Sequence, residues 1–453
     1  MSRKQSMNDL VSQLAEQDTQ KVKLAVTDID GVLRGKVVSF EKFKAIAEKG
    51  FGFCNVIFGW DAADLAYDNA KITGWHTGYP DATAMIDAST FRRVPWENNI
   101  PFFLADFADE KGGKLEVCPR SLLKKILAQS ESAGYIPKFS QEFEWFNFVD
   151  NRDALYESGF RDFQPLTPGM FGYSVLRASQ QSAFFNDLFD LLKKFGVPLE
   201  GIHTETGPGV YEAAITYSGI PEAADRAVLF KSGVKEIGHR HGILPSFMAK
   251  FSEHLPGCSG HIHQSLWSAN EEKNLFYDPK GMSALMESYI AGQLYCLPEI
   301  LPMFAPTVNS YKRLVEGAWA PTTLTWAVDN RTTALRVLKG GSSSTRLETR
   351  VVGSDANPYL AMAGCLASGL YGISKKLTLK TPETIGNGYA DKKNGTLPGN
   401  LKEASNAMRN SAVAKELFGE VFVEHFTGTR DWEWRQFSKS VTDWELKRYF
   451  EII

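Results

Sequence analysis

Acidic and imidazole side chains alternate with apolar ones in three separate segments, and this spacing limits how the chain can fold. The first segment, residues 141–146, reads QEFEWF. In an extended strand, Glu142 and Glu144 would point to one face while Phe143 and Trp145 pack behind them. Two carboxylates on one face of an apolar strand repel each other, so their burial is tolerable when a cation lies between them. The alternative is a strand with a solvated polar face.

Two further segments have the same character. Residues 203–212 (HTETGPGVYE) contain a Gly-Pro-Gly turn, so Glu205 and Glu212 are expected to face each other across a hairpin. Residues 257–267 (GCSGHIHQSLW) place His261 and His263 on one strand face. Oxygen ligands with a single imidazole suit Mg²⁺ or Mn²⁺ better than Zn²⁺. Taken alone, the alternatives are a surface hairpin and a structural histidine pair.

A series of arginines in the last third of the chain complements these acids. Its members are Arg313, Arg331, Arg336, Arg346 and Arg350. The run RLETR at 346–350 would place two arginines and Glu348 on one face of a strand. Guanidinium groups bind phosphate and carboxylate oxygens in a two-pronged way and stay charged. The sequence contains no glycine-rich phosphate loop, so if ATP binds, metals and arginines would have to hold it.

Composition is that of an ordinary globular chain with two or three domains. Of its 453 residues, 23% are charged and 43% apolar, with a formal net charge of −3. No basic stripe suggests nucleic acid, and no apolar run is long enough to span a membrane. The first 20 residues lack the apolar core of a signal peptide. Five well-separated cysteines without a C-x-x-C pair indicate reduced thiols in a cytoplasmic protein.

Local patterns predict elements around these segments. Residues 21–40 read as two strands joined by a turn at 30–31, and the charged stretch 109–114 reads as a loop between domains. Helices are predicted over 121–133, with Ser121 as N-cap, and over 179–195. Within 431–453, aromatic and apolar residues at helical spacing predict a packed terminal helix.

A competing function is suggested by residues 26–33, which read VTDIDGVL. This stretch resembles the Asp-x-Asp loop of haloacid-dehalogenase-type phosphatases, in which the first aspartate is a nucleophile. The next residues, RGKVV at 34–38, read as a return strand rather than the start of a helix. A hairpin turn is therefore favoured, and the phosphatase remains the rival from another class.

Further motifs resemble the glutamine synthetase family. They are NSYKRLV at 309–315, DNR at 329–331, ALR at 334–336 and NPYL at 357–360, in the family's order. The resemblance runs from about residue 21 to the C-terminus. It implies an α+β fold with a small N-terminal β-grasp-like domain (1–113) and a large catalytic domain (114–453) built on an antiparallel sheet and helices. It also implies a homo-oligomeric ring, a hexamer or stacked dodecamer, with active sites between subunits.

The resemblance gives a role to each group of residues. It implies two metal sites, formed by Glu144, Glu205 and Glu212 and by Glu142, His261 and Glu348. It implies nucleotide contacts at His263, Ser265, Arg336 and Arg346. It implies glutamate contacts at Gly257, Arg313 and Arg350, with Arg331 stabilising the transferring phosphoryl group. The implied cofactors are two or three Mg²⁺ or Mn²⁺ ions, with ATP and L-glutamate as substrates.

The chain departs from the family where ammonium binds. Family members carry a glutamate in a Gly-Tyr-Glu-Ala-Pro segment, whereas residues 317–321 read GAWAP and place Trp319 there. A family tyrosine is replaced by Met170 in GMFG at 169–172, and the Asp-Gly-Ser-Ser motif is not found. Ammonium needs carboxylates and polar oxygens to replace its water shell. Trp319 and Met170 offer stacking and dispersion contacts instead.

The sequence therefore predicts an ATP-dependent ligase that joins a bulky apolar or aromatic amine to L-glutamate through γ-glutamyl phosphate. A glutamine synthetase that uses ammonia is one alternative. A γ-glutamylpolyamine synthetase is another, because Asp61, Asp64 and Glu316 could provide acidic partners. A non-catalytic ring scaffold is a third, although the intact metal and arginine positions speak against it.

Overall fold

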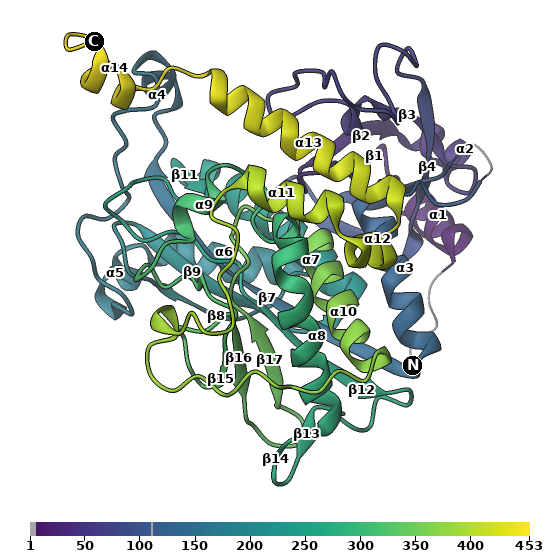
Figure 1. Cartoon of the computed structure of the whole chain (residues 1–453). Helices are drawn as coiled ribbons and strands as arrows, with labels where there is room; N and C mark the ends of the chain where they lie inside the picture. The colour runs from purple at the N-terminus through teal and green to yellow at the C-terminus, as the bar shows by residue number, and fades with distance from the viewer. Residues whose placement is uncertain (1–5, 110–111) are drawn as a thin grey trace.

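The computed structural model describes residues 6–109 and 112–453, and it contains two main β-sheets (Figure 1). The smaller sheet belongs to the N-terminal part of the chain and the larger one to the rest. Strand β6 (Ile100–Phe107) ends the first part and helix α3 (Pro119–Ser132) begins the second. The predicted domain boundary at 113/114 falls between these two elements.

The smaller sheet has six strands. They are β1 (Lys21–Thr27), β2 (Leu33–Ser39), β3 (Phe51–Cys54), β4 (Asp81–Ile86), β5 (Arg92–Val94) and β6. Their order is β2-β1-β6-β4-β3, with β5 beside β6, and β1 runs parallel to β6. Helices α1 (Met7–Glu16) and α2 (Phe40–Ile46) complete this part, whose own apolar core includes Leu10, Phe43 and Phe103.

The predicted hairpin at 21–40 is confirmed, because β1 and β2 pair antiparallel along their whole length. The Asp28 carboxylate closes the turn by accepting hydrogen bonds from the Asp30 and Val32 N–H groups (3.0 and 2.9 Å) and from Nε of Arg34 (3.0 Å). Asp30 forms an ion pair with Arg430. Both acids of the Asp-x-Asp sequence thus have structural partners, which removes the basis for the phosphatase.

The larger sheet has nine strands and carries most of the predicted site residues. The strands are β7 (Tyr135–Val149), β8 (Leu199–Thr204), β9 (Val210–Ile215), β10 (Ser218–Gly219), β11 (Ile243–Ser246), β12 (Ile262–Ser268), β15 (Trp326–Val328), β16 (Leu335–Leu338) and β17 (Arg346–Thr349). Their order is β15-β16-β17-β12-β7-β9-β8, with β10 and β11 alongside β7. Every pair is antiparallel except β15 with β16. A separate two-stranded ribbon joins β13 (Tyr277–Asp278) to β14 (Gly281–Met282).

One face of the larger sheet is covered by helices. The long ones are α3, α6 (Ser182–Lys194), α7 (Ile220–Arg240), α8 (Ala284–Ile300) and α10 (Pro358–Ser374). Phe143 on β7 stacks on Phe230 of α7, with ring centroids 5.5 Å apart. Because side chains alternate along β7, Glu142 and Glu144 point to the opposite face. Shorter helices are α4 (Arg152–Glu157), α5 (Val175–Gln180) and α9 (Ser310–Arg313).

The C-terminal helices connect the two parts of the chain. They are α11 (Leu401–Asn410), α12 (Ala412–Phe418), α13 (Glu420–Lys439) and α14 (Asp443–Tyr449). Helix α13 lies beside the N-terminal sheet (Figure 1), where Arg430 pairs with Asp30 and the Trp432 indole donates to Asp61 at 2.8 Å. The end of the chain therefore holds its beginning in place.

Three helix predictions need correction. Helix α3 begins two residues earlier than predicted, with Cys118 as N-cap and a proline in its first turn, so Ser121 lies inside it. The helix predicted over 179–195 is two helices, because Gln181 leaves helical geometry (φ −111°, ψ 27°) between α5 and α6. The packed helix predicted within 431–453 is also two helices: Trp434 of α13 packs against the core, α13 ends where Ser440 becomes extended, and α14 buries no residue.

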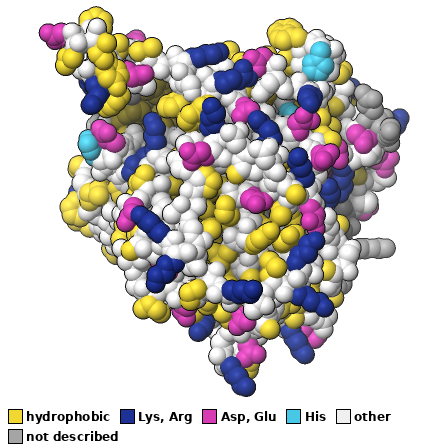
Figure 2. Space-filling model, viewed as in Figure 1, with side chains coloured by type: hydrophobic (Ala, Val, Ile, Leu, Met, Phe, Trp, Pro, Cys, Tyr) yellow, Lys and Arg dark blue, Asp and Glu magenta, His cyan; other side chains and the backbone are white. Residues whose placement is uncertain are grey.

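Three further features concern the membrane, the cysteines and the surface charge. Among the described residues, no helix is long and apolar enough to cross a membrane. All five cysteines are free thiols. On the face drawn in Figure 2, basic and acidic side chains are interspersed rather than gathered into a patch of one sign.

Candidate active site

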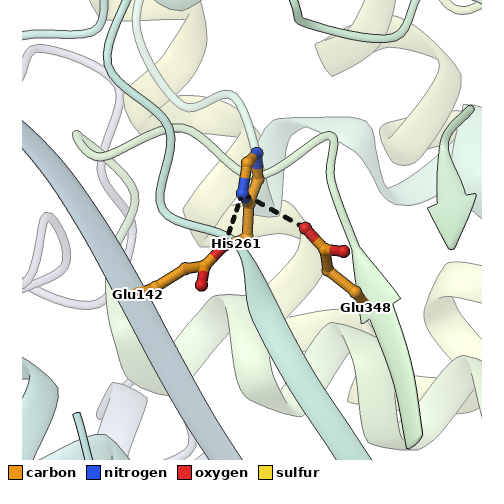
Figure 3. Close-up of side chains that lie close together, drawn as sticks. All are labelled: Glu142, His261 and Glu348. Carbon is orange, nitrogen blue, oxygen red and sulfur yellow. Dashed lines mark hydrogen bonds and ion pairs between the residues drawn. The ribbon is translucent and has the colours of Figure 1, made fainter. Parts of the chain in front are cut away.

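Three neighbouring strands bring Glu142, His261 and Glu348 together (Figure 3). Glu142 lies on β7, His261 directly precedes β12, and Glu348 lies on β17, in the sheet order β17-β12-β7. Nδ1 of His261 is 2.9 Å from Oε1 of Glu142 and 3.3 Å from Oε1 of Glu348. Because these strands are adjacent, side chains on one face meet across them.

The ionisation states of this cluster suit a divalent cation. Burial opposes the charge on Glu142, but the imidazoles of His263 and His261 outweigh it and hold its pKa well below the usual value. Burial likewise opposes the charge on Glu348, whose pKa is nevertheless lowered by His261 and Arg350. Burial lowers the pKa of His261, and its Nε2 atom is buried without a hydrogen-bond partner among the described residues. Anionic carboxylates gathered around Nδ1 of a neutral imidazole fit a metal ion.

A second cluster joins His203, Glu205 and Glu212 at the β8–β9 hairpin. The prediction placed Glu205 opposite Glu212, but the residue opposite Glu212 is His203, and Glu205 lies beyond the end of β8. Nδ1 of His203 is 3.8 Å from Glu205, and its Nε2 is 3.5 Å from Glu212. The sequence analysis missed His203. The position of the Gly-Pro-Gly turn would predict His203 as the partner of Glu212 only if the number of residues in the turn were known.

Glu212 marks the point where the acidic residues converge. It lies opposite Glu144 on β7, and the Glu144 carboxylate accepts a hydrogen bond from the Ser259 N–H at 2.6 Å. Burial raises the pKa of Glu212 to about 10, helped by the charges of Glu142, Glu144, Glu205 and Glu348. Carboxylates from separate strands thus repel one another in one small space. A divalent cation would relieve this repulsion.

A cavity of about 280 Å³ opens beside Glu142. Of the residues predicted to contact nucleotide, His263, Ser265 and Arg346 line it, and Nε of Arg346 lies 3.2 Å from Nδ1 of His263. Arg336 does not line it and instead donates to Glu348 at 3.0 Å. The lining also includes residues that the sequence analysis did not single out, such as Lys138, Tyr217 and Trp267.

The three residues predicted to contact glutamate lie together behind the metal cluster. The buried Arg313 donates to the Val351 carbonyl and to the Ser259 hydroxyl, both at 2.9 Å. Arg350 forms an ion pair with Glu348. At Gly257, a Cβ atom would lie 2.7 Å from Cγ of Arg313, so only glycine allows this approach.

Arg331 is tied to this group through its main chain. Its carbonyl accepts a hydrogen bond from Nε of Arg350 at 3.1 Å. Its positive charge lowers the pKa of the Tyr173 phenol, against a larger effect of burial that raises it. Arg331 is therefore joined to the glutamate group by its carbonyl, and its charge is felt at Tyr173, the aromatic residue next to His203.

The two residues assigned to the amine lie on separate surface loops. Trp319 is 59% exposed and has a left-handed backbone (φ +58°), and Met170 is 51% exposed. The loop of Met170 is fixed to β8, because the Thr204 hydroxyl donates to the Phe171 carbonyl at 3.0 Å. The Tyr173 ring packs against the His203 imidazole, with ring centroids 4.5 Å apart. Within the described part of the chain, no hydrogen bond, ion pair or ring contact joins the Met170 loop to Trp319.

The sequence also matches known proteins over nearly all its length. The model of the glutamine synthetase catalytic domain matches residues 116–449. The chain belongs to the glutamine synthetase family. A type-1 glutamine synthetase 2 of Dictyostelium discoideum is 53% identical over 450 residues, which cover 98% of this chain and 86% of that protein.

Two further proteins of known name resemble this member of the glutamine synthetase family. A glutamate–isopropylamine ligase of a Pseudomonas species is 37% identical over 438 residues, covering 95% of each chain. A solved structure of a GmaS complex with ADP superposes with a TM-score of 0.84 at 27% identity, covering 98% of this chain and 99% of that one. The protein is thus an ATP-dependent carbon–nitrogen ligase that acts on glutamate and uses ammonia or an amine.

Proposed function

We propose that this ligase joins a bulky apolar or aromatic amine to the side-chain carboxylate of L-glutamate. The observation that carries the proposal is Trp319, which stands in the segment where family members have the glutamate that takes a proton from ammonium. An indole cannot accept that proton, but it can stack on an apolar amine. An aniline-like amine is largely neutral at pH 7 and has less need of a base.

The acids that could replace the missing glutamate have partners within the chain. Glu316 lies three residues before Trp319 and pairs with Lys392 at 3.3 Å. Asp61 accepts a hydrogen bond from the Trp432 indole, and Asp64 pairs with an arginine of β2. Engaged carboxylates are poor sites for ammonium or for the second ammonium of a polyamine, which supports an apolar amine over both.

Aromatic side chains near the second metal cluster support the same conclusion. Tyr173 stacks on His203, and Phe171 and Met170 are more than half exposed on the same loop. Exposed aromatic and apolar side chains beside a charged cluster are typical of a binding surface. We also propose that a neighbouring subunit of a homo-oligomeric ring covers this loop and Trp319.

The proposed reaction begins with transfer of the γ-phosphoryl group of ATP to the glutamate side-chain carboxylate. Arg346 and His263 would hold the phosphate end of ATP in the cavity, and Arg331 would stabilise the transferring group. Arg313 and Arg350 would orient glutamate. The Glu142–His261–Glu348 and Glu144–Glu205–Glu212 groups would hold Mg²⁺ or Mn²⁺, which supplies positive charge to the phosphate oxygens. The neutral amine then attacks the acyl carbon of γ-glutamyl phosphate, inorganic phosphate leaves, and the nitrogen releases a proton to solvent as the amide forms.

Ammonia remains the second candidate, and a specific observation favours it. The relative that is 53% identical is named a glutamine synthetase. The 37% identical relative is named an isopropylamine ligase, so members of both kinds lie near this chain. The choice between ammonia and a bulky amine depends on which second substrate fills the space beside Trp319.

The test is phosphate release from ATP in the presence of glutamate and a panel of second substrates. The panel contains ammonia, isopropylamine, aniline, benzylamine and putrescine. We expect kcat/KM to be highest for an apolar or aromatic amine, and ammonia leading the panel would overturn the proposal. No glutamate-dependent turnover with any member would favour a scaffold. The Trp319→Glu variant should shift the preference toward ammonia, with Trp319→Phe as a control that keeps the apolar amine.

A further inference from the structure

A second cavity, of about 310 Å³, lies beside the outer strand of the larger sheet. It is lined by residues of α5, the start of α6 and β8, and β8 is the last strand in the sheet order. It shares no lining residue with the nucleotide cavity, and none of the residues assigned to glutamate lines it. The reaction described so far therefore gives this cavity no role.

His203 joins the cavity to the second metal cluster. It lines the cavity, and its ring nitrogens lie 3.8 Å from Glu205 and 3.5 Å from Glu212. Tyr173 also lines the cavity, and its ring packs against the His203 imidazole with centroids 4.5 Å apart. The cavity thus ends one side chain away from the carboxylates proposed to hold the metal.

The wall that carries Tyr173 is fixed to β8 by hydrogen bonds. The Tyr173 N–H donates to the Thr204 carbonyl at 2.7 Å, and the Ser174 N–H donates to the Thr204 hydroxyl at 2.8 Å. The Ser174 hydroxyl also caps α5 by accepting from the Arg177 N–H at 3.2 Å. Because these bonds hold the wall in the free chain, the cavity is formed before a ligand enters it.

The lining side chains indicate a neutral and largely apolar ligand. Ala178, Phe185 and Ile202 form the apolar part, while serine, threonine and asparagine side chains add hydrogen-bonding groups. Among the described residues that line the cavity, none is Asp, Glu, Lys or Arg. The second ammonium of a polyamine would therefore meet no carboxylate in this lining. An apolar cavity of about 150 Å³ holds benzene, so this one is large enough for a substituted aromatic ring.

We propose that this cavity receives the substituent of the amine substrate, while the amine nitrogen stays beside the metal cluster. This inference rests on the proposed function, because it requires a second substrate that carries a substituent. Trp319 lies on another loop and stands in place of a proton acceptor, so it affects whether ammonia is used. The cavity affects a different property, which is the size and polarity of the substituent that the enzyme accepts.

The test fills the cavity in the full-length protein. Ser182 is exposed at the first position of α6 and lines the cavity, so Ser182→Trp adds an indole there without disturbing the core. Ala183→Trp is the matched control, because Ala183 is also exposed but does not line the cavity. We expect the ratio of kcat/KM for benzylamine to kcat/KM for ammonia to fall about tenfold or more in Ser182→Trp. The ratio should keep its wild-type value in Ala183→Trp. An unchanged ratio in Ser182→Trp, or an equal fall in both variants, would overturn the inference.

Binding of para-fluorobenzylamine, followed by fluorine NMR with ADP, Mg²⁺ and glutamate present, reports occupancy without turnover. We expect saturable binding to the wild type and to Ala183→Trp, and binding weaker by about tenfold or more to Ser182→Trp. If ammonia led the kinetic panel while this binding pattern held, the proposed function would fail and the cavity would still be shown to take the ring. Binding that Ser182→Trp does not weaken would overturn the inference whichever substrate leads the panel.

Discussion

Glu212 lies between Glu144 on β7 and His203 on β8, and Nε2 of His203 is 3.5 Å from its carboxylate. The imidazole of His203 thus faces a carboxylate that several others repel. Without a metal ion, this arrangement costs stability, because burial and like charges both oppose ionisation of Glu212. With a metal ion, the same carboxylates become ligands.

Replacing Glu212 by glutamine tests this relationship. With a pKa of about 10, Glu212 is protonated in the folded metal-free protein at pH 8 and ionised in the unfolded chain, so folding must take up a proton. Glutamine removes this cost, and the metal-free variant should therefore melt at the same temperature as the wild type or higher at pH 8. The increase in thermal midpoint that Mn²⁺ gives to the wild type should disappear. Scanning calorimetry with chelator and then with Mn²⁺ measures both, and the exposed Glu48→Gln is the control. A large loss of stability without metal would contradict the prediction.

The same substitution at Glu348 should have the opposite effect on the metal-free protein. Glu348 is fully buried and its carboxylate pairs with Arg336, Arg350 and His261. Its loss leaves buried positive charge unpaired, which costs about 3 kcal/mol of unfolding free energy. Glu348→Gln should therefore melt earlier than the wild type even in chelator, and it should also lose Mn²⁺ binding. If the metal-free thermal midpoints of Glu212→Gln and Glu348→Gln both shifted in the same direction, the two carboxylates would not have the different surroundings described above.

A closed ring of buried hydrogen bonds lies directly behind the site. Tyr289 and Gln293 of α8 both donate to the side-chain carbonyl of Gln264 on β12, at 2.7 and 2.8 Å. Gln264 donates to the Thr349 hydroxyl at 2.7 Å, and that hydroxyl donates to Gln293 at 2.9 Å. Because Gln264 follows His263 and Thr349 follows Glu348, the ring holds two site strands in register.

Gln293→Leu should break this ring. Leaving the amide of Gln264 and the hydroxyl of Thr349 short of partners costs about 1–3 kcal/mol in the free energy of unfolding. Because the register of β12 and β17 loosens, the dissociation constant of Mn²⁺ should also increase. Urea unfolding and Mn²⁺ titration measure the two effects. Leu297→Met, a conservative change on the same helix, should alter neither, and an unchanged Mn²⁺ affinity in Gln293→Leu would limit the ring to a role in stability.

Lys231 should make stability depend on pH. Its ammonium donates to the Ser354 and Ala356 carbonyls, at 2.9 and 3.3 Å. Burial lowers its pKa from 10.5 to about 7, assisted by Lys235 and opposed by the charges of Asp355 and Asp30. Between these two pH values the unfolded chain binds the proton that the folded chain releases, so this group increases stability as pH rises from about 7 to 10.5.

Lys231→Met removes this titration while keeping a long apolar side chain. The difference in thermal midpoint between wild type and variant should therefore move in favour of the wild type as pH rises from 7 to 10. Paired melting curves in the same buffers cancel the titration of all other groups. A constant difference across this range would mean that Lys231 keeps its ordinary pKa in the folded protein.

Alternation along strands was enough to predict which faces carry the chemistry. Glu142 and Glu144 share one face of β7, and His261 and His263 both contact Glu142, as the period of two requires. The partner of Glu212 could not be found in this way. Pairing register depends on how many residues the turn takes up, and sequence spacing does not determine that number.

Features that depend on contacts between distant segments could not be predicted from the sequence either. The hydrogen bond from the Trp432 indole to Asp61, for example, joins residues that no local pattern relates. The C-terminal aromatic residues show a related limit: Trp434 packs against the core, yet Trp444 on α14 is 60% exposed, although Arg161 pairs with Asp443 at the start of that helix. Periodicity predicts a helix, but it does not say which surface the helix contacts.

The ion pair between Asp30 and Arg430 has a consequence for biosynthesis. These residues are 400 positions apart, so the β1–β2 hairpin emerges from the ribosome long before α13 exists to receive it. Until translation is nearly finished, the hairpin turn that carries Asp30 stays open to solvent and to neighbouring nascent chains. Premature termination just before codon 430 would therefore yield a polypeptide that retains every strand but lacks the ion pair between Asp30 and Arg430.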